Sequence, residues 1–130
     1  MATTADTERA EYQARAQLES IIEMVAALDT PDDDAREEAI QEIQESPLSV
    51  EIRSDWRTPG AESEDTEYRI LLCTGGPAVR ITGDLGRFNE PDSAQLEYQD
   101  WFTPWEKFHD TTNEEDEALL QYARQFYFDS

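Results

Sequence analysis

The chain has 130 residues, of which 31 are acidic and 10 are basic, so its formal net charge is −21 and its pI is about 4.1. A chain of this length builds one hydrophobic core. The charge argues against direct binding to DNA, RNA or an anionic membrane, because phosphates repel carboxylates. Hydrophobic residues make up 38% of the chain and aromatic residues 10%, which is enough apolar bulk for a small folded domain.

The residue types that are scarce exclude several kinds of site. Cys73 and His109 are the single cysteine and the single histidine, so neither an intramolecular disulfide nor a Cys/His zinc site is expected. The longest apolar run, Met24–Leu28, has five residues, whereas a membrane span needs about 20. The first six residues lack the basic and apolar regions of a signal peptide. We therefore expect a protein of the reducing cytoplasm, in a bacterial or a virus-infected cell.

Two helices are predicted in the N-terminal third, after a flexible tail over residues 1–6. The first is predicted over residues 7–28 because apolar residues recur at three- and four-residue spacing. Its apolar stripe consists of Tyr12, Leu18, Ile21, Ile22, Val25 and Leu28. The second helix is predicted to begin with Thr30 as N-cap and Pro31 at the first helical position. It should run to Glu45, and Ser46-Pro47 should end it.

Four strands are predicted between the second helix and the C-terminal region. From residue 48 the apolar period changes to two, and strand patterns cover residues 48–56, 68–73, 78–82 and 94–99. The second half of the second run is apolar on both faces, which favours a central strand covered on both sides. Gly75-Gly76 is typical of a hairpin turn. Hairpin connections imply an antiparallel meander.

A last helix and a single-domain organisation complete the predicted fold. Thr112 and Glu115 form the sequence pattern of a capping box, which predicts a helix start. The predicted fold class is therefore α+β, with two N-terminal helices, a four-stranded antiparallel sheet and one C-terminal helix packed on the sheet. Residues 7–130 form one domain, in which residues 7–46 are the helical part and residues 47–130 hold the sheet and the last helix.

No catalytic, cofactor-binding or metal-binding residue is predicted, and the chain is not expected to be an enzyme. The segment Cys73-Thr74-Gly75-Gly76-Pro77 joins two strands and lacks the lysine of a phosphate loop, and Cys73 has no base nearby in sequence. His109 and Asp110 are sequence neighbours, which do not face each other on a regular element. Asp32-Asp33-Asp34 lacks the spacing of a calcium loop.

The acidic residues are the main functional signal, and two interpretations of them stay open. A carboxylate-covered surface imitates the charge of DNA and attracts basic, nucleic-acid-binding proteins. The alternative is adaptation to high salt, which the ratio of nine arginines to one lysine also fits. For the first interpretation, the predicted partner-binding residues lie on the second and last helices. They are Asp32, Asp33, Asp34, Glu37, Glu38, Glu114, Glu115, Asp116 and Glu117.

Trp101 and Trp105 are a second candidate binding surface, since a partly exposed tryptophan is a common anchor of a protein interface. In the salt-adaptation alternative, this aromatic cluster binds a small ligand or a protein and the acidity serves solubility. The sequence is compatible with a monomer or a dimer.

The segments ILLCTGGPAVRI (residues 70–81), DWFTPW (residues 100–105) and QFYF (residues 125–128) resemble small uncharacterised proteins of bacteriophages and other mobile elements. The resemblance covers residues 48–128. It implies a setting in the host cytoplasm and an anti-defence role. The partner would then be a basic DNA- or RNA-binding host complex, such as a CRISPR–Cas effector or a restriction enzyme. The protein would act as an anti-CRISPR or anti-restriction inhibitor.

Overall fold

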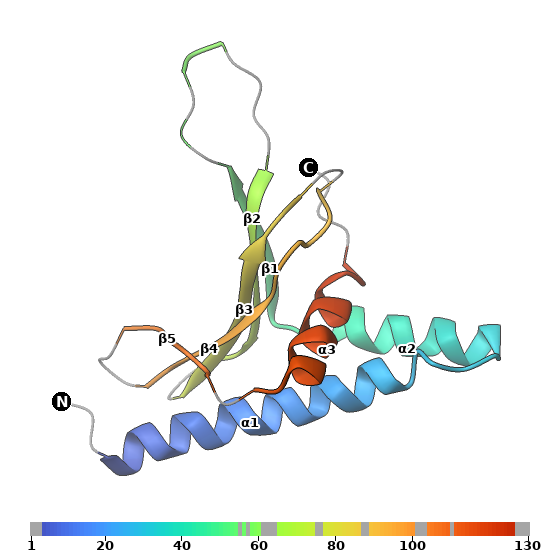
Figure 1. The fold of residues 1–130 in the computed structure, drawn as a ribbon, viewed down its shortest axis with the longest axis horizontal. Coiled ribbons are helices and arrows are strands. Elements are labelled where there is room, and N and C mark those ends of the chain that lie inside the picture. The colour runs from blue at the N-terminus through green and yellow to red at the C-terminus, as the bar shows by residue number, and fades with distance from the viewer. Residues whose placement is uncertain are drawn as a thin grey trace.

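The computed structural model describes residues 4–54, 56, 58–60, 65–74, 77–86, 89–100, 104–109 and 111–126, with only the backbone described for residues 4–8 and 65. In these residues the chain forms three helices and one antiparallel sheet of five strands, an α+β fold (Figure 1). The elements are α1 (Thr4–Ala26), α2 (Asp33–Glu45), β1 (Ser49–Ser54), β2 (Asp65–Cys73), β3 (Ala78–Asp84), β4 (Gln95–Gln99), β5 (Glu106–Lys107) and α3 (Asn113–Ala123).

Helix α1 buries one narrow stripe along its length. Ala10, Ala14, Leu18 and Ile21 are 0–1% exposed, at the three- and four-residue spacing of one helix face. The helix begins at Thr4, so the predicted tail over residues 1–6 is too long. The prediction that Tyr12 continues the stripe is wrong, because its side chain is 75% exposed. Tyr12 follows Ala10 by two residues, which is a rotation of about 200° around the helix axis. Its side chain therefore points away from the buried stripe.

The start of α2 differs from the prediction by two residues. The N-cap is Asp32, in extended backbone conformation, and its carboxylate accepts a hydrogen bond from the backbone N–H of Asp34 at 3.1 Å. Thr30, the predicted N-cap, instead accepts from the N–H of Asp32 through its hydroxyl. Aspartate is the stronger N-cap of the two, and Pro31 holds the preceding backbone extended. The predicted end at Glu45 is confirmed.

The sheet is a meander in the order β1-β2-β3-β4-β5, with every neighbouring pair antiparallel. The predicted hairpin between β2 and β3 is confirmed by their pairing, although Gly75 and Gly76 themselves lie outside the described residues. The two-residue strand β5 was not predicted, because two residues are too short to show a period. It adds Glu106 and Lys107 to the edge formed by β4.

The core lies between one face of the sheet and the helices α1 and α3. The register places Ile70, Ile81 and Leu96 side by side on this face, and each is 0–1% exposed. The prediction that β2 is covered on both sides is wrong, since Leu71 on the opposite face is only half-buried. All the described helices that contact the sheet pack on one face, so the other, called the open face below, carries mainly polar side chains.

Candidate protein-binding surface

Charge is distributed unequally between the helices and the sheet. Residues 29–45 contain eight carboxylates and one basic residue, Arg36. The open face of the sheet instead carries equal numbers of both signs. Its charged residues are Glu51, Glu67, Asp84 and Glu97, with Arg53, Arg69, Arg80 and Lys107. Compared with the open face, residues 29–45 therefore carry the excess of negative charge.

Helix α2 presents its carboxylates in a dense row along its exposed sides. We call this row the α2 acidic surface: it consists of Asp33, Asp34, Glu37, Glu38, Glu42 and Glu45, all of them exposed. The opposite side buries Ala39 and Ile43. The 13 residues of α2 span about 19 Å, which is one carboxylate per roughly 3 Å. A single DNA strand carries one phosphate per about 3.4 Å of axis, a similar density.

Asp32 lies next to the α2 acidic surface in sequence, but its role is structural. Its carboxylate caps the helix, so it orients the residues that follow it. Arg36 also supports this start, because its guanidinium donates to the carbonyl oxygen of Thr30 at 2.6 Å. The cap and this contact set the direction in which the α2 acidic surface leaves the turn after α1.

Two of the four acidic residues at the start of α3 are engaged within the protein. The predicted capping box is confirmed: Glu115 N–H donates to the Thr112 hydroxyl at 3.2 Å, and Thr112 N–H donates to the Glu115 carboxylate at 2.9 Å. Glu115 also accepts from Arg15 of α1 at 2.5 Å. The hydrogen bond from the Thr112 backbone, aided by Arg15, lowers the pKa of Glu115. Asp116 accepts from the Thr111 hydroxyl at 2.8 Å, and it is exposed, as are Glu114 and Glu117.

The two predicted acidic groups do not form one surface. The first turn of α3 meets α1 at Arg15, whereas α2 begins beyond the end of α1 at Ala26 (Figure 1). Eleven helical residues separate these two points of α1, which is about 16 Å along its axis. Of the nine predicted acidic residues, those on α2 therefore make the more continuous site.

A groove between α1 and α2 adjoins the α2 acidic surface. It encloses about 530 Å³. Its residues come from α1 and α2 with contributions from β2 and α3, and three of its rim residues are glutamates of α2: Glu38, Glu42 and Glu45. Apolar lining is supplied by Ile21, Met24 and Leu72. Sequence patterns could not predict this groove, since it depends on how the two helices diverge.

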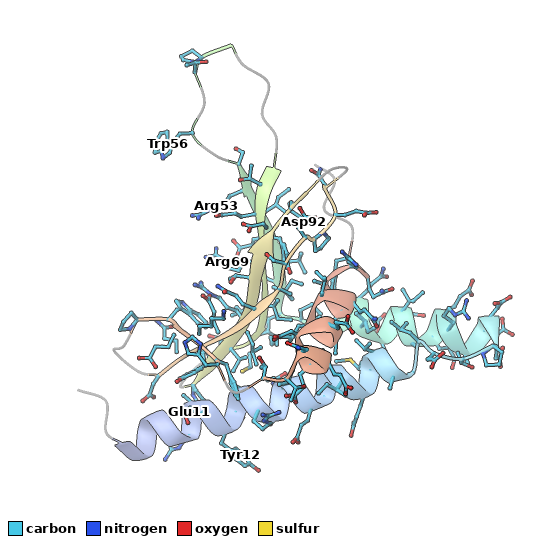
Figure 2. The ribbon with its side chains drawn as sticks, viewed as in Figure 1. Glu11, Tyr12, Arg53, Trp56, Arg69 and Asp92 are labelled. Carbon is cyan, nitrogen blue, oxygen red and sulfur yellow. The ribbon has the colours of Figure 1, made fainter. Side chains whose placement is uncertain are left out.

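The open face of the sheet is crossed by ion pairs between neighbouring strands. Arg69 donates to Glu51 at 2.9 Å, Arg53 to Glu67, and Arg80 to Glu97 at 2.7 Å. Figure 2 shows Arg53 and Arg69 on the side of the sheet away from α3. These residues line a shallow cavity of about 460 Å³. Six of its eight charged residues are paired across the strands and the two signs are equal in number, so this face offers no net charge to a ligand.

Of the two tryptophans predicted as interface anchors, the structure describes one. Trp105 is half-buried, and the guanidinium of Arg80 lies 4.0 Å from the centre of its ring, a cation–π contact. Trp101 lies outside the described residues. A third tryptophan, Trp56, was predicted as part of the first strand, yet it lies two residues beyond β1 and is fully exposed (Figure 2). The nearby Pro59-Gly60 was the sequence signal that the strand had already ended.

Cys73 has the environment of a core thiol. It is half-buried and packs against the core, and the side-chain amide of Gln13 lies 3.9 Å from its sulfur. Burial raises the pKa of the thiol, which keeps it protonated and weakly nucleophilic at neutral pH. His109 is exposed. Within the described ranges, no three His, Cys, Asp or Glu side chains cluster as a metal site, and no helix is both long and apolar enough to cross a bilayer.

No protein-family model, curated protein or solved structure matches this chain. The resemblance to phage and mobile-element proteins therefore stays a prediction from the sequence.

Proposed function

We propose that the protein is a non-enzymatic inhibitor that binds a basic, nucleic-acid-handling host protein, with the α2 acidic surface in the place of a phosphate backbone. A CRISPR–Cas effector or a restriction enzyme is the kind of partner that this role requires. The interaction is driven by the attraction between carboxylates and a basic groove, so it is fast and sensitive to salt.

The segregation of charge is the observation that supports this proposal. Adaptation to salt alone spreads carboxylates over all surfaces, whereas here the open face of the sheet is balanced and residues 29–45 hold eight acids against one base. The mean density of carboxylates along the axis of α2 also resembles that of phosphates along one DNA strand. A phosphate mimic needs both features: a local excess of charge and a phosphate-like charge density on a rigid element.

The test is competition with duplex DNA for a purified effector. A CRISPR–Cas effector and a restriction enzyme are each mixed with labelled duplex DNA and increasing amounts of the protein. We expect displacement of the DNA by the wild-type protein, with a midpoint that moves to higher protein concentration as salt rises. The variant Asp33→Asn/Asp34→Asn/Glu37→Gln/Glu38→Gln should lose this displacement. Asp32 is left intact because it caps the helix.

A matched control distinguishes a local site from general acidity. The variant Glu11→Gln/Glu19→Gln/Glu114→Gln/Glu117→Gln removes the same number of charges from exposed positions outside α2. It should compete like the wild-type protein. Equal loss in both variants would show that only the net charge matters, and no loss in either would refute the site on α2.

A second function is favoured by the exposed Trp56 and by the Arg80–Trp105 contact: a salt-adapted ligand-binding or protein-interaction domain that uses its aromatic residues and open face. Its binding would resist both salt and competing DNA. Capture from a bacterial lysate, eluted first with duplex DNA and then with a salt gradient, separates the two functions. Partners retained through both elutions but lost from a Trp56→Ala variant would favour the second.

A further inference from the structure

We propose that β1 is a self-association edge, at which two copies of this chain pair antiparallel and join their sheets into one. The twofold axis passes beside Ile52. This inference concerns the sheet and stands apart from the function proposed for α2.

The free edge of β1 is the first observation. In the order β1-β2-β3-β4-β5, β1 has a strand partner on one side only among the described residues. The strand has six residues and contains neither proline nor lysine, and its pairing with β2 is regular from Ser49 to Arg53, with a register shift only at Ser54. Leu48 and Val50, at its start, are 59% and 37% exposed. An open edge beside exposed apolar side chains favours the addition of a strand.

The order of charged and apolar residues in β1 is complementary to that of a second, antiparallel copy of the strand. This complementarity favours a second copy of the chain as the partner of the β1 edge. When Ile52 faces Ile52 of the second copy, Glu51 faces Arg53 of that copy, and Arg53 faces its Glu51. Opposite charges and apolar pairs facing each other across strands both stabilise a sheet.

The ion pairs on the open face prepare the charged residues for this contact. Glu51 accepts from Arg69, and Arg53 donates to Glu67, so both side chains are held on the same face of the sheet. Their side chains are still 54% and 77% exposed. Pairing extends the contacts to a row of alternating sign: Arg69 and Glu51 of one copy, then Arg53 and Glu67 of the other.

Two chains of net charge −21 repel each other, but the β1 edge lies away from the main source of this repulsion. Strand β1 contains one acid and one base, so it is locally neutral. The α2 acidic surface belongs to a different element, and added salt screens the repulsion that remains. Self-association should therefore strengthen from low to moderate salt, opposite to the salt response of the proposed partner binding.

Sedimentation velocity over a concentration series tests the charge complementarity. Glu51→Arg and Arg53→Glu each place like charges opposite each other twice in the dimer, and each should weaken self-association by roughly tenfold. An equimolar mixture of the two variants restores opposite charges at both positions, so heterodimers should form as strongly as wild-type dimers. Glu19→Arg and Arg9→Glu make the same changes of charge on α1 and should leave self-association unchanged.

Disulfide trapping tests the register independently of charge. In a Cys73→Ser background, Ile52→Cys should form an interchain disulfide on mild oxidation, because residue 52 lies opposite its own copy. Val50→Cys is the control: it shares the same face, but the two copies of residue 50 lie about 13 Å apart along the strands. A monomer at every concentration, or self-association that neither charge variant alters, would overturn the proposal. So would crosslinking at residue 50 without crosslinking at residue 52.

Discussion

Arg15 of α1 and Glu115 of α3 form an ion pair at 2.5 Å that joins two helices separated by 100 positions in the sequence. Glu115 is also part of the capping box that starts α3. The guanidinium of Arg15 in turn lies 5.4 Å from the centre of the Phe108 ring. One carboxylate thus connects the start of α3 to the middle of α1, which fixes where the acidic first turn of α3 lies.

Replacing Glu115 with Gln should lower the melting temperature at neutral pH and weaken its dependence on acid. The pKa of Glu115 is lowered in the folded protein, so its contribution to stability is complete above the unfolded pKa of about 4.3. That contribution is lost as the pH falls through the folded-state pKa. Thermal melts from neutral pH to about pH 3 measure the effect. Glu114→Gln, at an exposed position on the same turn, should keep the wild-type acid dependence; identical curves for both variants would contradict the assignment.

Asp32→Ala should destabilise the protein by about 1 kcal/mol, because it removes the N-cap hydrogen bond to Asp34 N–H. Asp32→Asn keeps a capping oxygen and should cost only a few tenths of a kcal/mol. Urea unfolding monitored by far-UV circular dichroism gives both values. Thr30→Ala serves as the comparison for the start predicted from sequence: a larger loss there than at Asp32 would show that Thr30 caps the helix in solution.

Gly83→Ala should destabilise the protein by about 3 kcal/mol. A Cβ at this position would collide with the carbonyl oxygen of Ser93 and lie 2.7 Å from the ring and hydroxyl of Tyr68. Tyr68 donates a hydrogen bond to that same carbonyl at 2.6 Å. Tyr68→Phe removes only the hydrogen bond and should cost about 1 kcal/mol. Chemical denaturation compares the two; equal losses would mean that the close approach of the backbone is unimportant.

Tyr122→Phe should cost about 1 kcal/mol although it removes a single oxygen atom. The tyrosine is fully buried in the core, and its hydroxyl lies 2.5 Å from the Ser46 hydroxyl. Ser46 itself donates to the carbonyl of Ile43 at 2.6 Å, so Tyr122 is the donor of the pair. The contact ties α3 to the end of α2. Tyr12→Phe, at an exposed position, should be within a few tenths of a kcal/mol of the wild type in the same unfolding experiment.

Local patterns predicted most of the fold. The capping box of Thr112 and Glu115, the end of α2 at Glu45 and the pairing of β2 with β3 are confirmed, because each depends on residues close together in sequence. The start of α2 was wrong because Thr30 and Asp32 compete as caps within two residues. Strand β5 was missed because its two residues exist as a strand only beside β4.

The sequence by itself determined the charge, the order of every element except β5 and the identity of the acidic residues. Only the tertiary structure decided how these residues are grouped. The acids of α2 and of the first turn of α3 lie at different points along α1, whereas Arg53, Arg69 and Arg80 gather on one face of the sheet through strand register. The tertiary structure also decided that the side chains of Leu48 and Trp56 are exposed. Helix and strand periods specify which side of an element is apolar, but packing between distant elements decides which surface is left for a partner.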